Sequence, residues 1–163
     1  MQIESRESIA IHALLVLRHL LKDYEEYIVS DKMIKFLTRL VSKERKPNNS
    51  KKIAVLMFIR DFFQNTKQEF NQDKLNLANI LLSEIQYSEP EMSELVECFA
   101  FFAEKASEQD ALILMPNINN FTAMAAISLN MMSTRAHNLF YLSRFYITML
   151  HKVPSFRTQF IHD

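Results

Sequence analysis

The side chains of this chain that could carry chemistry do not form a familiar catalytic or metal-binding motif. The single cysteine, Cys98, lies in an apolar segment, which favours a small core residue over a nucleophile. Zinc needs three or four converging ligands, and no histidine stands at a ligand spacing from a cysteine or from another histidine. We therefore expect no metal site and no cofactor. The scattered histidines are His12, His19, His137, His151 and His162.

The complete absence of glycine argues against nucleotide chemistry. Glycine supplies the tight turns and the close approach to phosphate on which a P-loop or a dinucleotide-binding turn depends. The motifs HExxH, CxxC and GxSxG are absent as well. Glu25 and Glu26 are adjacent, so they point to different sides of a helix and make a poor acid–base pair. We predict that the protein is not an enzyme.

The overall charge gives no field that would steer the protein to nucleic acid or to a membrane. Nineteen basic and nineteen acidic side chains cancel, and apolar residues make up 48% of the 163 positions. The amino end is a poor signal peptide, and no apolar run approaches the ~20 residues that span a bilayer. One cysteine suggests a reducing compartment. We expect an intracellular protein, cytoplasmic or nuclear, without membrane association.

Charge is nevertheless distributed unevenly along the chain. A basic loop precedes an acidic stretch that runs from Glu84 to Asp110. Such a loop can touch phosphate or an acidic tail, although a charge run is more often simply solvated. Nucleic-acid binding through this loop and through Arg135, Arg144, Lys152 and Arg157 is therefore the weaker hypothesis. The basic loop consists of Lys43, Arg45, Lys46, Lys51 and Lys52.

The elements that must position these side chains are helices. Without glycine and with only four prolines, the chain offers long uninterrupted windows at helical spacing. Residues 9–41 predict a long apolar helix capped by Ser5 or Ser8, a short connecting helix over 24–29, and an amphipathic helix capped by Ser30 or Asp31. Residues 43–50 are the clearest loop.

This pattern of a long, a short and a medium helical piece recurs downstream. A second unit begins at Ser50, with its short piece over 66–73. A third begins at the strong helix start Ser88-Glu89-Pro90-Glu91, has its short piece over 107–116, and continues from Asn117 in a separate helix. Ser133 opens a fourth long helix to about Lys152, and Pro154 begins a last short one. A period of about 42 residues predicts stacked helical repeats.

The long helices carry the segments ALLVLRHLL, LMFIRDFF and NLFYLSRFY, followed by pieces such as EEYIVSD, QEFNQD and TQFIHD. In these segments and in its period the chain resembles the armadillo (or HEAT-type) repeat family. The resemblance implies a right-handed α-solenoid of about four repeats, forming a single all-α domain over 1–163. An irregular helical bundle is the alternative. The glycine that commonly separates the family's first two helices is absent here.

In armadillo proteins the long helix lines a concave groove, and an asparagine near its middle often holds an extended peptide. The resemblance places His19, Asp61, Phe101 and Arg144 at that asparagine position. It places Leu15, Met57, Glu97 and Phe140 one turn earlier, where importin-like members often carry tryptophan. The asparagine–tryptophan ladder is therefore missing. The groove is expected to take a partner peptide or helix by an aromatic anchor with charged neighbours, unless Phe101 and Phe140 simply pack between repeats.

Neither end of the chain has the polar cap that a solenoid needs. The first long helix is apolar nearly all round, and the chain stops just after a first-helix segment. We expect either a fragment of a longer solenoid or ends that bury themselves by self-association. The function we expect is a non-catalytic protein–protein interaction scaffold within a multiprotein assembly, with a self-associating structural module as the alternative.

Overall fold

The computed structural model describes residues 2–43, 50–67, 69–83, 87–130 and 134–162. Within these residues the protein is all-α, and no strand occurs among them. The first four helices are α1 (Gln2–Ile28), α2 (Asp31–Lys43), α3 (Ser50–Asn65) and α4 (Gln72–Ser83). The other four are α5 (Glu89–Lys105), α6 (Glu108–Ser128), α7 (Arg135–Lys152) and α8 (Pro154–His162). None of the described helices is both long and apolar enough to cross a bilayer.

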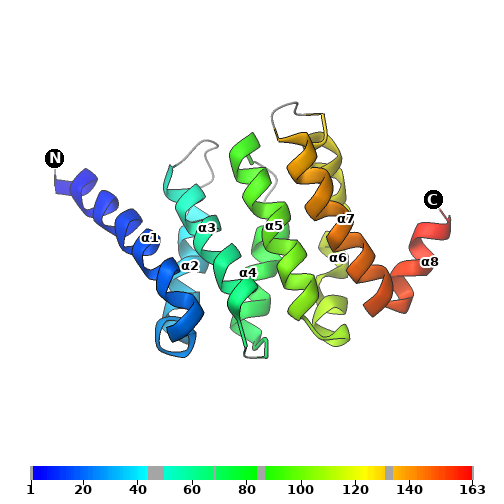
Figure 1. Cartoon of the computed structure of the whole chain (residues 1–163), viewed down its shortest axis with the longest axis horizontal. Coiled ribbons are helices and arrows are strands. Elements are labelled where there is room, and N and C mark those ends of the chain that lie inside the picture. The colour runs from blue at the N-terminus through cyan, green and yellow to red at the C-terminus, as the bar shows by residue number, and fades with distance from the viewer. Residues whose placement is uncertain (1, 44–49, 68, 84–86, 131–133, 163) are drawn as a thin grey trace.

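The helices lie in two layers (Figure 1). In one layer α1, α3, α5 and α7 stand side by side in chain order, each packed against the next. In the other layer α2 packs on α4, and α4 packs on α6. The chain therefore alternates between layers, and α8 packs against α7 near the carboxyl end. We call the first layer the odd row.

The core lies between the layers and is richest in phenylalanine around α5. Phe102 contacts Phe63 and Phe70, with ring centroids 5.4 Å and 4.7 Å away. Phe99 contacts Phe121 at 5.0 Å, which links α5 to α6. Offset and edge-on ring pairs of this kind add to the free energy gained by burying the rings. These contacts hold α3, α5 and α6 in fixed positions relative to one another.

The two ends of α5 are satisfied by specific polar contacts. At its start the Ser88 backbone N–H donates to the Glu91 carboxylate at 2.7 Å, and Pro90 occupies the first turn, as the sequence predicts. At its end the Lys152 ammonium donates to the carbonyls of Ala103, Glu104 and Ala106 at 2.7–2.8 Å. A cation at this place satisfies carbonyls that have no partner within the helix.

The short piece expected between the long and the medium helix of each unit is helical only in part. After α1 the short piece is the end of the same helix, beyond a kink at Tyr24 (φ −129°, ψ 28°). Residues 66, 67 and 69–71 are not helical. The helix start predicted at Ser5 or Ser8 was wrong, because α1 begins at Gln2 and both serines lie inside it. Ser133 lies outside the described residues.

The helix break predicted between residues 116 and 117 was also wrong. Residues 108–128 form one helix, with Pro116 inside it. Proline removes one backbone donor, which normally ends a helix. Here Pro116 and Leu112, four residues earlier, are both exposed. The Leu112 carbonyl that loses its partner can therefore bond to water, which lowers the cost of continuing the helix.

Candidate functional site

The side chains expected to line a groove lie along the odd row, where most of them contact the neighbouring helix. On α3, Asp61 accepts a hydrogen bond from Arg18 of α1 at 2.6 Å. The same Arg18 guanidinium lies 3.6 Å from the Met57 sulfur. Of the two expected residues on α1, His19 is exposed and Leu15 is partly buried. The surface between α1 and α3 is therefore closed by an ion pair.

Arg60 is the centre of the charged part of this row. Its guanidinium contacts Asp61 at 2.8 Å on its own helix, and Glu94 at 2.6 Å and Glu97 at 3.5 Å on α5. All four side chains are at most 19% exposed. Burial raises the pKa of Glu94, and the nearby Arg60 charge opposes that rise. The cluster joins α3 to α5 and leaves little charge free for a partner.

The row becomes aromatic between α5 and α7. The Phe101 ring lies 5.9 Å from Tyr141, and the Arg144 guanidinium lies over it at 5.1 Å. Arg144 also forms a bidentate pair with Glu104 of α5. The Phe140 ring packs edge-on against Tyr141 at 5.0 Å. The last two helices of the row thus present rings and one arginine together.

These side chains differ sharply in their access to solvent. Phe101 is only 5% exposed, because Tyr141 and Arg144 cover it, whereas Phe140 is 60% exposed. Phe101 therefore packs between neighbouring helices and cannot act as a free anchor. Phe140 remains open.

Three polar side chains surround Phe140 and Tyr141. His137 lies 3.6 Å from the Glu97 carboxylate and 4.8 Å from the Tyr141 ring. Burial, together with a hydrogen bond to Glu97, raises the pKa of Tyr141. With Arg144, these groups give Phe140 a polar border. We define Phe140, Tyr141, His137 and Arg144 as the aromatic patch.

Sequence reasoning missed several residues of this row. Arg18 and Arg60 occupy the same place in consecutive long helices, 42 residues apart, so the repeat itself carried a signal. Tyr141 and Glu104 carried no such signal, because the equivalent positions one repeat earlier hold unlike residues, Cys98 and Gln64. The missed residues are Arg18, Arg60, Glu94, Glu104, His137 and Tyr141.

Two residues of the expected basic loop lie outside the described residues, and the other three belong to helices. Arg45 and Lys46 are the two outside, and Lys43 is the last residue of α2. Lys51 and Lys52 belong to the first turn of α3 instead of a loop. Lys52 is buried, with its ammonium 4.3 Å from the centre of the Tyr87 ring. Its charge is therefore not part of an exposed basic surface.

Cys98, considered from the sequence as a possible nucleophile, makes a structural contact in the core. The Cys98 thiol is fully buried and donates to the Leu56 carbonyl at 3.4 Å. Burial raises the pKa of this thiol well above its ordinary value, which disfavours the reactive thiolate. Among the described residues, no group of three or more histidine, cysteine or acidic side chains is arranged to hold a metal ion.

Known proteins add no information on this site. Nothing matches the chain among protein-family models, curated proteins or solved structures.

Proposed function

We propose that the protein is a non-catalytic interaction scaffold built from armadillo-like repeats in a right-handed α-solenoid. The spacing of contacts along the odd row supports this proposal. Glu25 accepts a hydrogen bond from Thr66, 41 residues later, and Asp61 accepts one from Arg18, 43 residues earlier. Ser93 bonds to Asn138 across 45 residues. Contacts one repeat apart, recurring from helix to helix, are typical of repeat stacking.

The aromatic patch is the part of the row best suited to a partner. Its central ring, Phe140, is largely exposed, and Tyr141, His137 and Arg144 give it a polar border. Interfaces concentrate their binding free energy in tyrosine, tryptophan and arginine that surround an apolar anchor. A helix or extended segment of another protein that offers an apolar side chain to Phe140 would fit this arrangement.

The exposure of Phe140, beside Tyr141 and Arg144 that pack against α5, is the observation that carries the proposal. A photo-crosslinking amino acid at position 140 should capture a specific protein in cell extract. The same amino acid at Ile113, an exposed residue of α6 in the other layer, is the matched control. A protein captured only from position 140 would then be purified for direct binding.

The purified partner allows the site to be tested by substitution. Phe140→Ala and Arg144→Ala should each weaken its binding about tenfold or more, the usual scale for an interface anchor. Circular dichroism would establish that both variants stay folded. Equal capture from positions 140 and 113, or unchanged affinity of both variants, would place the partner site elsewhere.

A further inference from the structure

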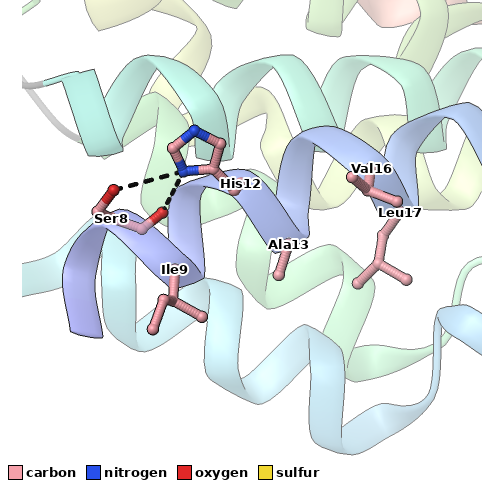
Figure 2. Close-up of a pocket in the computed structure, with 6 residues that line it drawn as sticks. All are labelled: Ser8, Ile9, His12, Ala13, Val16 and Leu17. Atoms are coloured by element: carbon pink, nitrogen blue, oxygen red, sulfur yellow. Dashed lines mark hydrogen bonds between the residues drawn. The ribbon is translucent and has the colours of Figure 1, made fainter. Parts of the chain in front are cut away.

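The first helix of the odd row carries an apolar stripe that nothing in the described structure covers. Val16 is 61% and Leu20 43% exposed, and Ile9 and Tyr24 are exposed above and below them. Figure 2 shows residues of this helix that line a shallow hollow at its surface, among them Ile9, Ala13 and Val16. The residues recur every three or four positions and so share one side of α1. We call Ile9, Ala13, Val16, Leu20 and Tyr24 the head face.

The corresponding positions of the next two helices in the row are buried. One repeat after Ala13, Val16, Leu20 and Tyr24 in the sequence, the equivalent four residues in or just after α3 are buried. One repeat further, the equivalent four residues in or just after α5 are buried as well. At α3 these are Val55, Phe58 and Phe62, with Thr66 just after the helix. At α5 they are Leu95, Cys98 and Phe102, with Ala106 just after the helix.

This buried side of each helix faces the preceding helix of the row. The Cys98 thiol of α5 donates to the Leu56 carbonyl of α3, and the Phe102 ring of α5 lies 5.4 Å from the Phe63 ring of α3. Just after α3, the Thr66 hydroxyl donates to Glu25 of α1. The head face is therefore the surface on which a preceding helix of the same kind would pack.

The last long helix has the complementary exposed surface. Leu139 is 52% and Ile147 57% exposed, and Phe140 lies beside them. Leu139 takes the place that Leu56 and Val96, both buried, hold in α3 and α5. The Leu56 carbonyl accepts from Cys98 of the following helix, and Glu104, at the position equivalent to Ile147, pairs with Arg144 of the following helix. We call Leu139, Phe140 and Ile147 the tail face.

Electrostatics also favour joining the two faces. Inside the row, Glu97 lies close to His137, and Glu104 pairs with Arg144. One repeat later, the positions of Glu97 and Glu104 are held by Phe140 and Ile147.

Across such a joint, the two positions that would face Phe140 and Ile147 hold no carboxylate either. One repeat before α3, the positions equivalent to those of His137 and Arg144 are held by His12 and His19. A joint that continued the geometry of the row would therefore bury apolar side chains and leave no carboxylate buried without a partner at these positions. A buried carboxylate without a partner would be costly.

From these two faces we propose that the tail face of one copy of this chain docks on the head face of a second copy and extends the odd row. The contact is heterologous, so each addition leaves a new head and a new tail. The product is an open linear series of copies whose length grows with concentration. This assembly goes beyond the scaffold function and does not depend on it.

Two pairs of substitutions test the proposal on the full chain. Val16→Glu with Leu20→Glu blocks the head face, and Leu139→Glu with Ile147→Glu blocks the tail face, because a carboxylate there would be buried in the joint. By sedimentation velocity the wild type should gain mass steadily with concentration, and each double variant alone should stay monomeric. An equimolar mixture of the two should form a dimer, with a twofold gain in mass and no further growth. Ile113→Glu on α6 is the control and should assemble like the wild type.

Several outcomes would overturn the proposal. A wild-type chain that stays monomeric at every concentration would mean that another molecule, or a further segment of a longer protein, covers these faces. Self-association that survives in the tail variant would mean head-to-head pairing. If the mixture forms no dimer, although both variants show the wild-type circular dichroism spectrum, the head face and the tail face do not bind each other. Phe140 belongs to the tail face as well as to the aromatic patch, so in assembled wild type position 140 would crosslink a second copy. Crosslinking to another protein is therefore scored in the monomeric head variant, Val16→Glu with Leu20→Glu, which leaves Phe140 and Arg144 intact and uncovered.

Discussion

Arg60 is the side chain on which the charged part of the odd row depends. It brings together three carboxylates, of Asp61, Glu94 and Glu97, in a setting that is mostly shielded from water. Without a cation the three negative charges would repel one another. Arg60 is the guanidinium that contacts all three, while Arg18 pairs with Asp61 as well.

We expect Arg60→Ala to lower the free energy of unfolding by about 2 kcal/mol near pH 7, because it leaves partly buried carboxylates unpaired. Burial already raises the pKa of Glu94 above its ordinary 4.5, so the folded state holds this proton more tightly than the unfolded chain. Stability due to Glu94 is thus present at low pH and lost as pH rises through the raised pKa. In the variant this loss should be larger.

Urea unfolding at several pH values measures the effect. The deficit of Arg60→Ala relative to the wild type should shrink as the pH falls toward 4.5, the ordinary pKa of a glutamate. The exposed Arg39 of α2 provides the control, and Arg39→Ala should change stability by less than about 0.5 kcal/mol. A deficit that does not vary with pH would mean that Arg60 acts by packing alone.

At the scale of elements, α5 is the helix around which the others are placed. It packs on α3, α6 and α7, and its buried residues lie on nearly every side of the helix. Phe102 belongs to this surface and is buried in contact with three other rings, those of Phe63, Phe70 and Phe99. A helix buried in this way owes its position to packing more than to its own propensity.

Phe102→Ala should therefore lower the free energy of unfolding by about 3–5 kcal/mol, because it removes buried area and leaves a cavity between α3 and α5. Phe36→Ala on α2 is the matched control, since that ring is already partly exposed, and it should cost less than about 1 kcal/mol. Chemical unfolding followed by circular dichroism gives both values. Similar losses for the two variants would count against a core centred on α5.

The contact of Lys152 with α5 gives a second test at this scale. Lys152→Met keeps the aliphatic stem but removes the ammonium from three carbonyls, and we expect a loss of about 1–2 kcal/mol. Lys32→Met, at an exposed position of α2, should be close to neutral. If thermal unfolding shows the two variants alike, water replaces the ammonium without cost.

At the scale of the whole molecule, each described helix of the odd row packs mainly against its neighbours in the row, with further contacts to helices of the other layer and, for α7, to α8. Stability in such an arrangement is greatest where a helix has neighbours on both sides. α5 has α3 before it and α7 after it, whereas α1 has a neighbour on one side only. The amino-terminal half of α1 should therefore open more often than the centre.

Amide hydrogen exchange should show this gradient directly, with slowest exchange in α5 and fastest in the first turns of α1. If copies join head to tail, protection of α1 should also increase with protein concentration, while protection of α5 stays constant. Uniform exchange along the odd row would contradict the end effect. Concentration-independent exchange at α1 would contradict the joining of copies.

The sequence by itself determined that the chain is all-α and where most helices begin, because these features depend on local spacing, on capping residues such as Ser88 and Glu91, and on the absence of glycine. It did not determine that Pro116 would lie inside a helix. That outcome depends on whether the Leu112 carbonyl faces water, which the arrangement of the layers decides.

For the candidate site as well, the sequence determined one part and the tertiary structure the other. The repeat placed Asp61, Phe101 and Arg144 at one position of successive long helices and Phe140 one turn earlier. The helices that carry them, α3, α5 and α7, belong to the odd row. Only the tertiary structure decided that Phe101 is covered while Phe140 is open. The exposure of a side chain in a row depends on whether another helix follows, and that is a property of packing between distant segments rather than of the local sequence.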